Sequence, residues 1–168
     1  GAPVLLVPKR DIHGATERWR LVCDWRDLNK VTERDTYPLP DINDVLDAFQ
    51  GMKYFSTLDI KSAFWSVPVH PNSRPYTALV TPDGSYAWKR MGMGMKNASS
   101  AWQRIINTAL AGLTWNQTLC FCDDIVIFSR TEEDHIRDIG LVLERIRKAN
   151  FSVHIQKCHW GYASVSFL

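Results

Sequence analysis

Short apolar runs rich in β-branched and aromatic residues alternate along the chain with stretches of helical periodicity. Near the N-terminus, apolar runs at residues 3–7 and 19–25 flank a polar loop at residues 10–18, which predicts a hairpin. Residues 54–60 predict a buried strand with one carboxylate near its end. The turn sequence Pro82-Asp83-Gly84 lies between two β-rich runs and predicts a second hairpin.

Three segments have the spacing of amphipathic helices. Asp41 is a suitable N-cap for a short helix that ends near Gly51. A longer helix follows from apolar residues at i, i+3, i+4, i+7 spacing. Thr131, with Asp134 three residues later, resembles a capping box and opens a third helix to about Ala149. The predicted apolar faces are, in order, Ile42, Val45, Leu46 and Phe49; Trp102, Ile105, Ile106, Ala109, Leu110 and Leu113; and Ile136, Ile139, Leu143 and Ile146.

The order of elements indicates the fold class. Two apolar runs, at residues 119–122 and 125–128, flank a pair of aspartates, which predicts a tight hairpin with both carboxylates at its tip. Two further strands are predicted near residues 151–155 and 163–168. The second half of the chain therefore predicts an α+β fold, in which helices pack on one face of an antiparallel sheet.

Composition narrows the class of protein. The chain has 168 residues, of which 45% are hydrophobic and 23% charged, so we expect one domain, or one domain built as two lobes, and exclude a disordered protein. Four cysteines favour a reduced, intracellular setting over a disulfide framework. No apolar run approaches the roughly 18 residues that a membrane span needs. Both ends are abrupt, which indicates a piece of a larger protein.

Charge placement says more than net charge, because 20 Lys and Arg against 18 Asp and Glu give only +2. Residues 86–104 carry four cations, Lys89, Arg90, Lys96 and Arg104, and no anions. Residues 35–47 carry four anions and no cations. These runs are typical either of solvated faces or of a nucleic-acid groove on one face.

Asp123 and Asp124 are the strongest chemical signal. Adjacent carboxylates repel each other. Asp is a common residue in turns, so a plain polar turn is one explanation for the pair. Here, however, the residues on both sides are apolar, so a bound cation is the better explanation of how the two negative charges are neutralised. Asp59, at the end of another apolar strand, is the natural third ligand. Three carboxylates suit Mg²⁺ or Mn²⁺.

Two stretches of sequence surround the three aspartates: Asp59 lies within YFSTLDIKSAFW, and the other two end the sequence Phe121-Cys122-Asp123-Asp124. Further motifs are Trp19-Arg20 with Asp24, Arg26, Leu28 and Asn29; YPLP at 37–40; VTPDG at 80–84; Asn97-Ala98; Gln103-Arg104; TEEDH at 131–135; and Lys157-Cys158. In these motifs and their order, the chain resembles the reverse transcriptases of gypsy-type long-terminal-repeat retrotransposons.

The resemblance covers nearly the whole chain and implies the fingers and palm of a right-hand polymerase. It implies a single reverse transcriptase domain fragment over residues 1–168, with fingers at about 1–34 and 67–96 and palm at about 35–66 and 97–168. The thumb and ribonuclease H regions are absent from this chain.

The resemblance also implies roles for individual residues. Asp59, Asp123 and Asp124 are the catalytic carboxylates, and with the backbone of Ile60 they hold two Mg²⁺ ions, with Mn²⁺ as a substitute. The residues that contact the nucleotide are Arg20, Phe64, Met93 and Lys157. Lys9 either assists Arg20 in binding the triphosphate or is a solvated charge of the hairpin. Phe64 is a steric gate against ribose, or alternatively a core aromatic. Residues that contact the primer-template are Phe121, Cys122, Lys89, Arg90 and Gln103.

The implied function is an RNA-directed DNA polymerase that takes primed RNA or DNA templates and deoxynucleoside triphosphates. The implied location is the cytoplasm or a virus-like particle, or the nucleus. The sequence departs from the family at Phe121, where the family has Tyr; at Gly92-Met93-Gly94, where it has Pro-Phe-Gly; and at Ser99, where it has Pro. These departures leave open a second interpretation, a decayed or domesticated module that binds nucleic acid or a protein partner.

Overall fold

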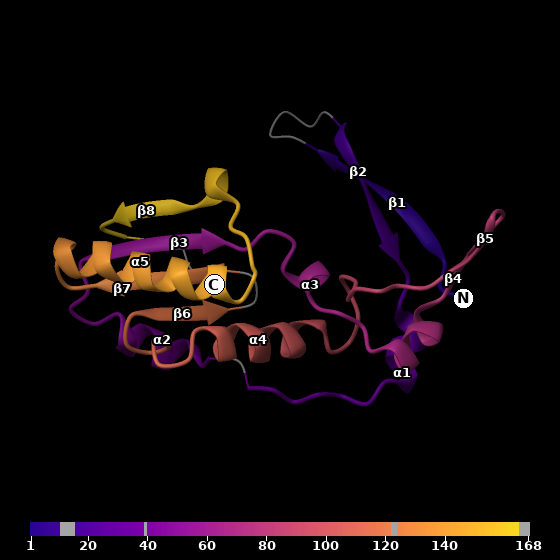
Figure 1. The fold of residues 1–168 in the computed structure, drawn as a ribbon, viewed down its shortest axis with the longest axis horizontal. Helices are drawn as coiled ribbons and strands as arrows, with labels where there is room; N and C mark the ends of the chain where they lie inside the picture. The colour runs from indigo at the N-terminus through magenta and orange to yellow at the C-terminus, as the bar shows by residue number, and fades with distance from the viewer. Residues whose placement is uncertain (11–15, 39, 122–123, 165–168) are drawn as a thin grey trace. The chain divides into compact units, whose positions relative to one another are not determined.

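The structure is a computed structural model that describes residues 1–10, 16–38, 40–121 and 124–164 (Figure 1). The chain forms two compact units. The first consists of residues 1–35 and 64–98, and the second of residues 36–63 and 99–168. Whether these units are the fingers and the palm stays a prediction. Among the described helices, none is long and apolar enough to cross a membrane.

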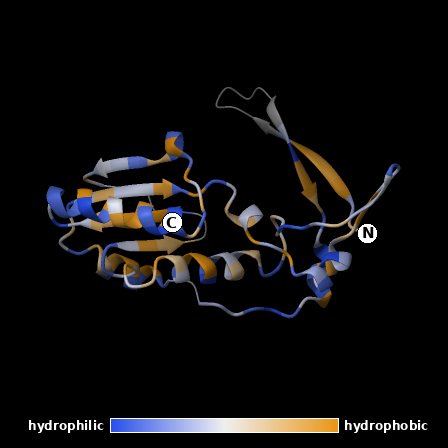
Figure 2. Ribbon diagram, viewed as in Figure 1, coloured by the Kyte–Doolittle hydropathy of each residue, from blue (hydrophilic) through white to orange (hydrophobic). Residues whose placement is uncertain are grey.

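The first unit contains two small antiparallel sheets, and both predicted hairpins form. The pairs are β1 (Val4–Arg10) with β2 (Thr16–Cys23), and β4 (Leu79–Thr81) with β5 (Gly84–Tyr86). The strands β1 and β2 extend further into the predicted polar loop than their apolar runs alone indicate. The helices of this unit are α1 (Arg26–Val31) and the 3₁₀ helix η1 (Pro71–Thr77), and α3 (Ala63–Ser66) begins at its boundary. Figure 2 colours most of β1 hydrophobic, and its Leu5 and Leu6 are exposed.

Trp25 is the centre of the core of the first unit. Its side chain is 3% exposed and packs with Cys23 and Leu79. The indole Nε1 donates a hydrogen bond to the carbonyl oxygen of Met93 at 3.0 Å. The Trp25 ring also meets Trp88 edge-on, with 6.0 Å between ring centroids. These contacts tie the end of β2 to the segment around Met93.

The second unit is built on a four-stranded sheet in the order β6-β7-β3-β8 (Figure 1). Its strands are β3 (Tyr54–Asp59), β6 (Thr118–Phe121), β7 (Asp124–Ser129) and β8 (His159–Tyr162), and the neighbouring strands are antiparallel. The central position of β7 follows from its sequence, because Ile125, Val126 and Ile127 are fully buried. The predicted α+β fold with an antiparallel sheet is confirmed.

Side chains alternate between the two faces of this sheet. On one face, Phe55, Val126 and Phe128 pack with Val45 of α2 (Ile42–Ala48). On the other face, Ser56 and Ser129 point toward α5 (Glu132–Lys148), which packs on β7 and β3. Helices thus lie on both faces of the sheet and not on one face as predicted, and alternation places Asp59 on the face opposite α5.

The remaining helix of the second unit, α4 (Ala98–Ala109), follows the predicted pattern. Trp102, Ile106 and Leu110 are buried, and the Trp102 ring packs edge-on against Phe151 at 5.1 Å between centroids. Both predicted helix caps are confirmed. The Asp41 side chain accepts from the backbone N–H of Asn43, and the Thr131 hydroxyl accepts from the backbone N–H of Asp134.

Three details differ from the sequence-based expectation. Ile42 and Leu46 of α2 are exposed, whereas Val45 is buried in the core of the sheet and Ala48 and Phe49 pack against it. On α5, the buried residues are His135, Asp138, Val142 and Ile146, whereas Ile136 is 65% exposed. The helix is rotated relative to its apolar stripe because polar partners in the sheet bind His135 and Asp138.

The third difference concerns the strands after α5. The segment at 151–155 makes only one isolated bridge, Ile60 with Val153, and its end enters the 3₁₀ helix η2 (Ile155–Lys157). The last described strand is β8, at His159–Tyr162, ahead of the strand expected at residues 163–168. Residues 165–168 lie outside the described residues.

Candidate active site

Asp59 and Asp124 face each other across two neighbouring strands. The antiparallel register of β3 with β7 runs from Tyr54 opposite Ser129 to Asp59 opposite Asp124. Alternation places both carboxylates on one face of the sheet, with Thr57 as the next residue of β3 on that face. Two carboxylates from segments 65 positions apart are thus brought to the same edge of the sheet. Such a pair is stabilised by a cation.

The third predicted carboxylate, Asp123, lies outside the described residues, as does Cys122. The strands around them are described: β6 ends at Phe121, which is the register partner of Asp124. Within the described part of the chain, no three His, Cys, Asp or Glu side chains are placed to hold a metal ion together. The two described carboxylates are hard oxygen ligands of the kind that Mg²⁺ prefers.

A cationic side chain reaches Asp59 from the far end of the sequence. The Lys157 Nζ lies 2.9 Å from Oδ2 of Asp59, and the Lys157 side chain is about half exposed. The backbone supports this contact, because the N–H of His154 donates to the carbonyl of Asp59 at 2.8 Å. The N–H of Lys61 likewise donates to the carbonyl of Ser152 at 2.7 Å. The segment after α5 therefore lies along the end of β3 and brings Lys157 to the site.

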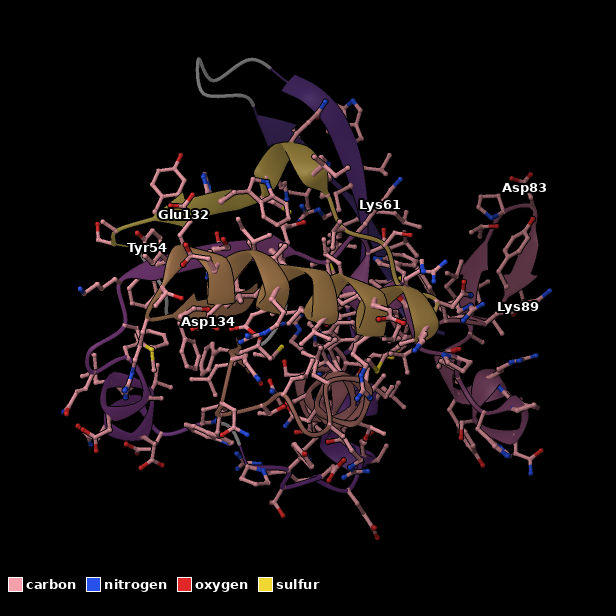
Figure 3. The ribbon with its side chains drawn as sticks, turned by 60° about the vertical axis from the view of Figure 1, so that its left-hand side comes forward. Tyr54, Lys61, Asp83, Lys89, Glu132 and Asp134 are labelled. Carbon is pink, nitrogen blue, oxygen red and sulfur yellow. The ribbon has the colours of Figure 1, made fainter. Side chains whose placement is uncertain are left out.

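Figure 3 shows how the ends of β3 differ. Tyr54, at one end, lies near Glu132 and Asp134 at the start of α5, whereas Lys61 follows the other end, where Asp59 is located. The carboxylate site is thus at the end of β3 away from the N-terminus of α5.

Gln103, which the sequence predicts to contact the primer-template, lies in the protein interior and not at the surface. It is fully buried, and its Nε2 donates to the carbonyl of Cys120 at 2.8 Å and to Oδ1 of Asn107 at 3.1 Å. A buried side chain offers nothing for a direct nucleic-acid contact. Gln103 instead braces α4 against β6, the strand that leads into the aspartate pair.

Two of the residues predicted to contact a nucleotide lie together in the first unit. Arg20 and Met93 line one small cavity of about 20 Å³, together with Trp25, Trp65, Trp88 and Gly92. The Arg20 side chain is exposed, and Met93 is 43% exposed. The sequence places these residues 73 positions apart, so their proximity comes from the fold. The ring of Phe64 is half-buried.

The two cations predicted at the primer-template, Lys89 and Arg90, are exposed. The Arg90 guanidinium donates to the carbonyl of Ser66 at 2.7 Å, and the carbonyl of Lys89 accepts from the N–H of Val69 at 2.9 Å. Lys9 belongs to β1, but its side chain lies outside what the structure describes.

Sequence reasoning missed one set of polar residues in the second unit. Ser56, Ser129, His135 and Asp138 are buried and hydrogen-bonded to one another. The available signal was the i, i+3 spacing of His135 and Asp138 on one face of the helix, beside the apolar stripe.

Comparison with known proteins places the chain among polymerases. A family model described as reverse transcriptase (RNA-dependent DNA polymerase) matches residues 7–168. A retrovirus-related Pol polyprotein from the transposon opus of Drosophila melanogaster is 36% identical over 167 residues, which is 99% of this chain and 17% of that polyprotein.

Solved structures agree with the fold. A foamy viral protease-reverse transcriptase in complex with double-stranded DNA is 25% identical, with a TM-score of 0.85, over 99% of this chain and 28% of that one. The same kind of protein with an RNA/DNA hybrid is 24% identical, with a TM-score of 0.84, over 99% of this chain and 22% of that one. These matches confirm the family resemblance carried by the motifs.

Proposed function

Because the chain belongs to the reverse transcriptase (RNA-dependent DNA polymerase) family, we propose that it adds deoxynucleotides to a primer 3′ end by two-metal-ion catalysis. The observation that supports this most is the register of β3 with β7, which sets Asp59 opposite Asp124 at one edge of the sheet. The chain spans about a sixth of the opus polyprotein. We therefore propose this activity for a polymerase that includes this chain.

The residues present fit a divalent cation. Asp59 and Asp124 supply carboxylate oxygens, Ile60 supplies a backbone carbonyl, and Asp123 is the proposed third carboxylate. When bound, two Mg²⁺ ions activate an attacking hydroxyl and stabilise a leaving phosphate, and Mn²⁺ can replace them. The role of the chain is to align the carboxylates, and the register of β3 with β7 supports this by setting Asp59 opposite Asp124.

The nucleotide-contacting roles rest on the family motifs and on charge. Arg20 is an exposed guanidinium, which suits the oxygens of a triphosphate. Met93 lines the same cavity as Arg20. Lys157 already pairs with an anionic oxygen and can do the same with a phosphate. We assign Phe64 the exclusion of the ribose 2′-hydroxyl, because its side chain is the bulky residue at the position that the motif gives to this role.

The proposed partners are a primed RNA or DNA template and deoxynucleoside triphosphates. The solved relatives were captured with an RNA/DNA hybrid and with double-stranded DNA. Lys89 and Arg90 are exposed cations suited to phosphate contacts, and Phe121 with Cys122 leads into the aspartate pair. Gln103 acts indirectly, by bracing β6. We place this activity inside the cell, in the cytoplasm, a virus-like particle or the nucleus.

Primer extension tests the proposal. A polymerase that includes this chain and the region after it is given a primed RNA template with each deoxynucleotide in turn, with Mg²⁺, with Mn²⁺ or with a chelator. We expect metal-dependent addition of the complementary nucleotide only. A module that binds the primed template but adds nothing with either metal would instead support the domesticated alternative.

A further inference from the structure

A buried relay of polar side chains links α5 to three strands of the sheet. The hydroxyl of Ser56 lies 2.7 Å from Nε2 of His135, and Nδ1 of His135 lies 3.1 Å from the hydroxyl of Ser129. The Ser129 hydroxyl donates to Oδ2 of Asp138 at 2.8 Å. The backbone N–H of Gly161 donates to the Ser56 hydroxyl at 3.0 Å. The side chains of the relay are at most 4% exposed.

Counting hydrogens gives the direction of every bond in the relay. A serine hydroxyl has one hydrogen, and that of Ser129 goes to the Asp138 carboxylate. The Nδ1 of His135 must therefore carry the hydrogen in its contact with Ser129. In the neutral ring Nε2 is then the acceptor, so it takes the single hydrogen of Ser56. Ser56 is left with lone pairs, one of which accepts from Gly161.

Gly161 needs this acceptor because β8 is bulged there. Phe55 pairs with Tyr162 and Thr57 pairs with His159, so two residues of β8 lie opposite the single residue Ser56. Gly161 has φ +65°, a conformation suited to glycine in a bulge. Its N–H bonds to a side chain where a regular ladder would offer a backbone carbonyl.

The bulge at Gly161 and the carboxylate site both lie along β3 and the segment that pairs with it. Ser56 and Asp59 are three residues apart on β3, and Gly161 and Lys157 are four residues apart on the segment that pairs with it. Where the bulge is fixed, the position of Lys157 along β3 is fixed as well.

We propose that His135 is a positioning residue for the site at the end of β3. Through Ser56 it fixes the bulge at Gly161. The fixed bulge holds the preceding turn in place, so that Lys157 meets Asp59. The catalytic importance of this contact rests on the proposed function, but the contact itself can be measured without any activity.

Burial favours the neutral form of His135 in this relay, against the charge of Asp138. Asp138 reaches His135 through Ser129 and also accepts from the Arg137 guanidinium at 3.3 Å. The ring of Tyr54 lies 6.1 Å from the imidazole, centroid to centroid. Burial lowers the pKa of His135, and the nearby charge of Asp138 opposes that shift only in part. A protonated ring would donate from Nε2 and leave the hydrogen of Ser56 without this acceptor.

The test compares variants of the 168-residue chain under conditions where each is folded. His135→Leu and Ser56→Ala break the relay, whereas His135→Gln can restore it, because one amide donates and accepts at a similar spacing. Two quantities are measured: amide hydrogen exchange at Gly161 by NMR, and the rate of reductive methylation at Lys157 relative to Lys61 by mass spectrometry. Neither measurement requires template, nucleotide or metal.

In the relay-breaking variants we expect Gly161 exchange to accelerate by about five- to tenfold, the size of one net hydrogen bond. Lys157 methylation should accelerate by up to about fivefold, as for an exposed ion pair that is lost. His135→Gln should restore both values toward wild type. The matched control is Val142→Ala, a core truncation on the buried face of α5 outside the relay.

Unchanged Gly161 exchange and Lys157 methylation in His135→Leu would overturn the proposal. Equal changes in Val142→Ala would also overturn it, because they would show that any loss of packing under the sheet has the same effect. If both rates change as expected but the wild-type polymerase adds no nucleotide, the result would count against the proposed function and not against this positioning role.

Discussion

Lys157 forms an ion pair with Asp59, with 2.9 Å between Nζ and Oδ2, although the two residues are 98 positions apart in the sequence. An ammonium group thus already lies against one of the carboxylates that we propose to bind Mg²⁺. A metal ion bound by Asp59 must share the carboxylate with the Lys157 ammonium or displace it, and the two positive charges repel each other.

Replacing Lys157 with Gln should therefore have opposite effects on metal and on nucleotide. Removing the competing charge should tighten Mn²⁺ binding by up to about fivefold, the range of an exposed ion pair. The same change should raise the KM for deoxynucleotides. Electron paramagnetic resonance measures the bound Mn²⁺, and Lys61→Gln is the control for a nearby exposed cation. Equal Mn²⁺ affinities in Lys157→Gln and wild type would contradict competition at Asp59.

Most of the elements and part of the site could be predicted from the sequence because they depend on local signals. The caps at Asp41 and Thr131 are local, and so is the strand that ends at Asp59. The rotation of α5 was not predictable, because it depends on partners such as Ser56 that lie 79 positions from His135. The spacing of apolar residues predicts that Ile136 is buried, and it cannot predict that a hydrogen-bonded histidine is buried in its place.

The strands after α5 show a second limit. The run at 151–155 has β-forming residues, yet the structure gives it one bridge and makes the strand at His159–Tyr162. The decisive features are the Gly161 bulge and its bond to Ser56, which involve residues 105 positions apart. For the same reason no local pattern in the sequence pairs Lys157 with Asp59, which lies 98 positions away.

Two glycines should respond in opposite ways to alanine. A Cβ at Gly92 would lie 3.2 Å from Cζ2 of Trp25, and that ring is fixed by its bond to Met93. Gly92→Ala should lower the free energy of unfolding by about 1 kcal/mol through overpacking. Gly140, inside α5, has open space around its Cβ position. Gly140→Ala should raise stability by about 1 kcal/mol through helix propensity.

Urea unfolding measures both changes. A neutral or stabilising Gly92→Ala would show that the Trp25 ring can move aside.

The buried imidazole predicts a pH dependence of stability. Because burial lowers the pKa of His135 in the folded chain, the unfolded chain takes up a proton first as pH falls. The stabilisation is therefore fully present above the ordinary histidine pKa of about 6.5 and declines as pH falls from there toward the folded pKa. Unfolding free energies from pH 7.5 to pH 5 measure this decline.

His135→Gln is the control, because it cannot titrate and leaves the other histidines in place. The difference between wild type and His135→Gln should shrink as the solution is acidified. A pH-independent difference would contradict the account, because it would mean that the pKa of His135 is the same in the folded and the unfolded chain.

Phe64 should determine the choice of sugar. A side chain that excludes a hydroxyl by bulk needs only that bulk, so Phe64→Val should raise ribonucleotide use more than it lowers deoxyribonucleotide use. The ratio of kcat/KM for the two sugars, measured on the same primed template, reports this directly. An unchanged ratio would assign Phe64 to the core of its unit.

The carboxylates themselves allow the most direct test. In a polymerase that includes this chain, the rate of deoxynucleotide addition on a primed RNA template is compared for wild type, Asp59→Asn, Asp123→Asn and Asp124→Asn. Glu144→Gln, on the exposed side of α5, is the charge-matched control. Because an amide keeps the shape and removes the charge, we expect Asp59→Asn and Asp123→Asn to lose several orders of magnitude in rate while remaining folded. Glu144→Gln should match wild type, and addition within about threefold of wild type by Asp123→Asn would contradict two-metal catalysis at this site.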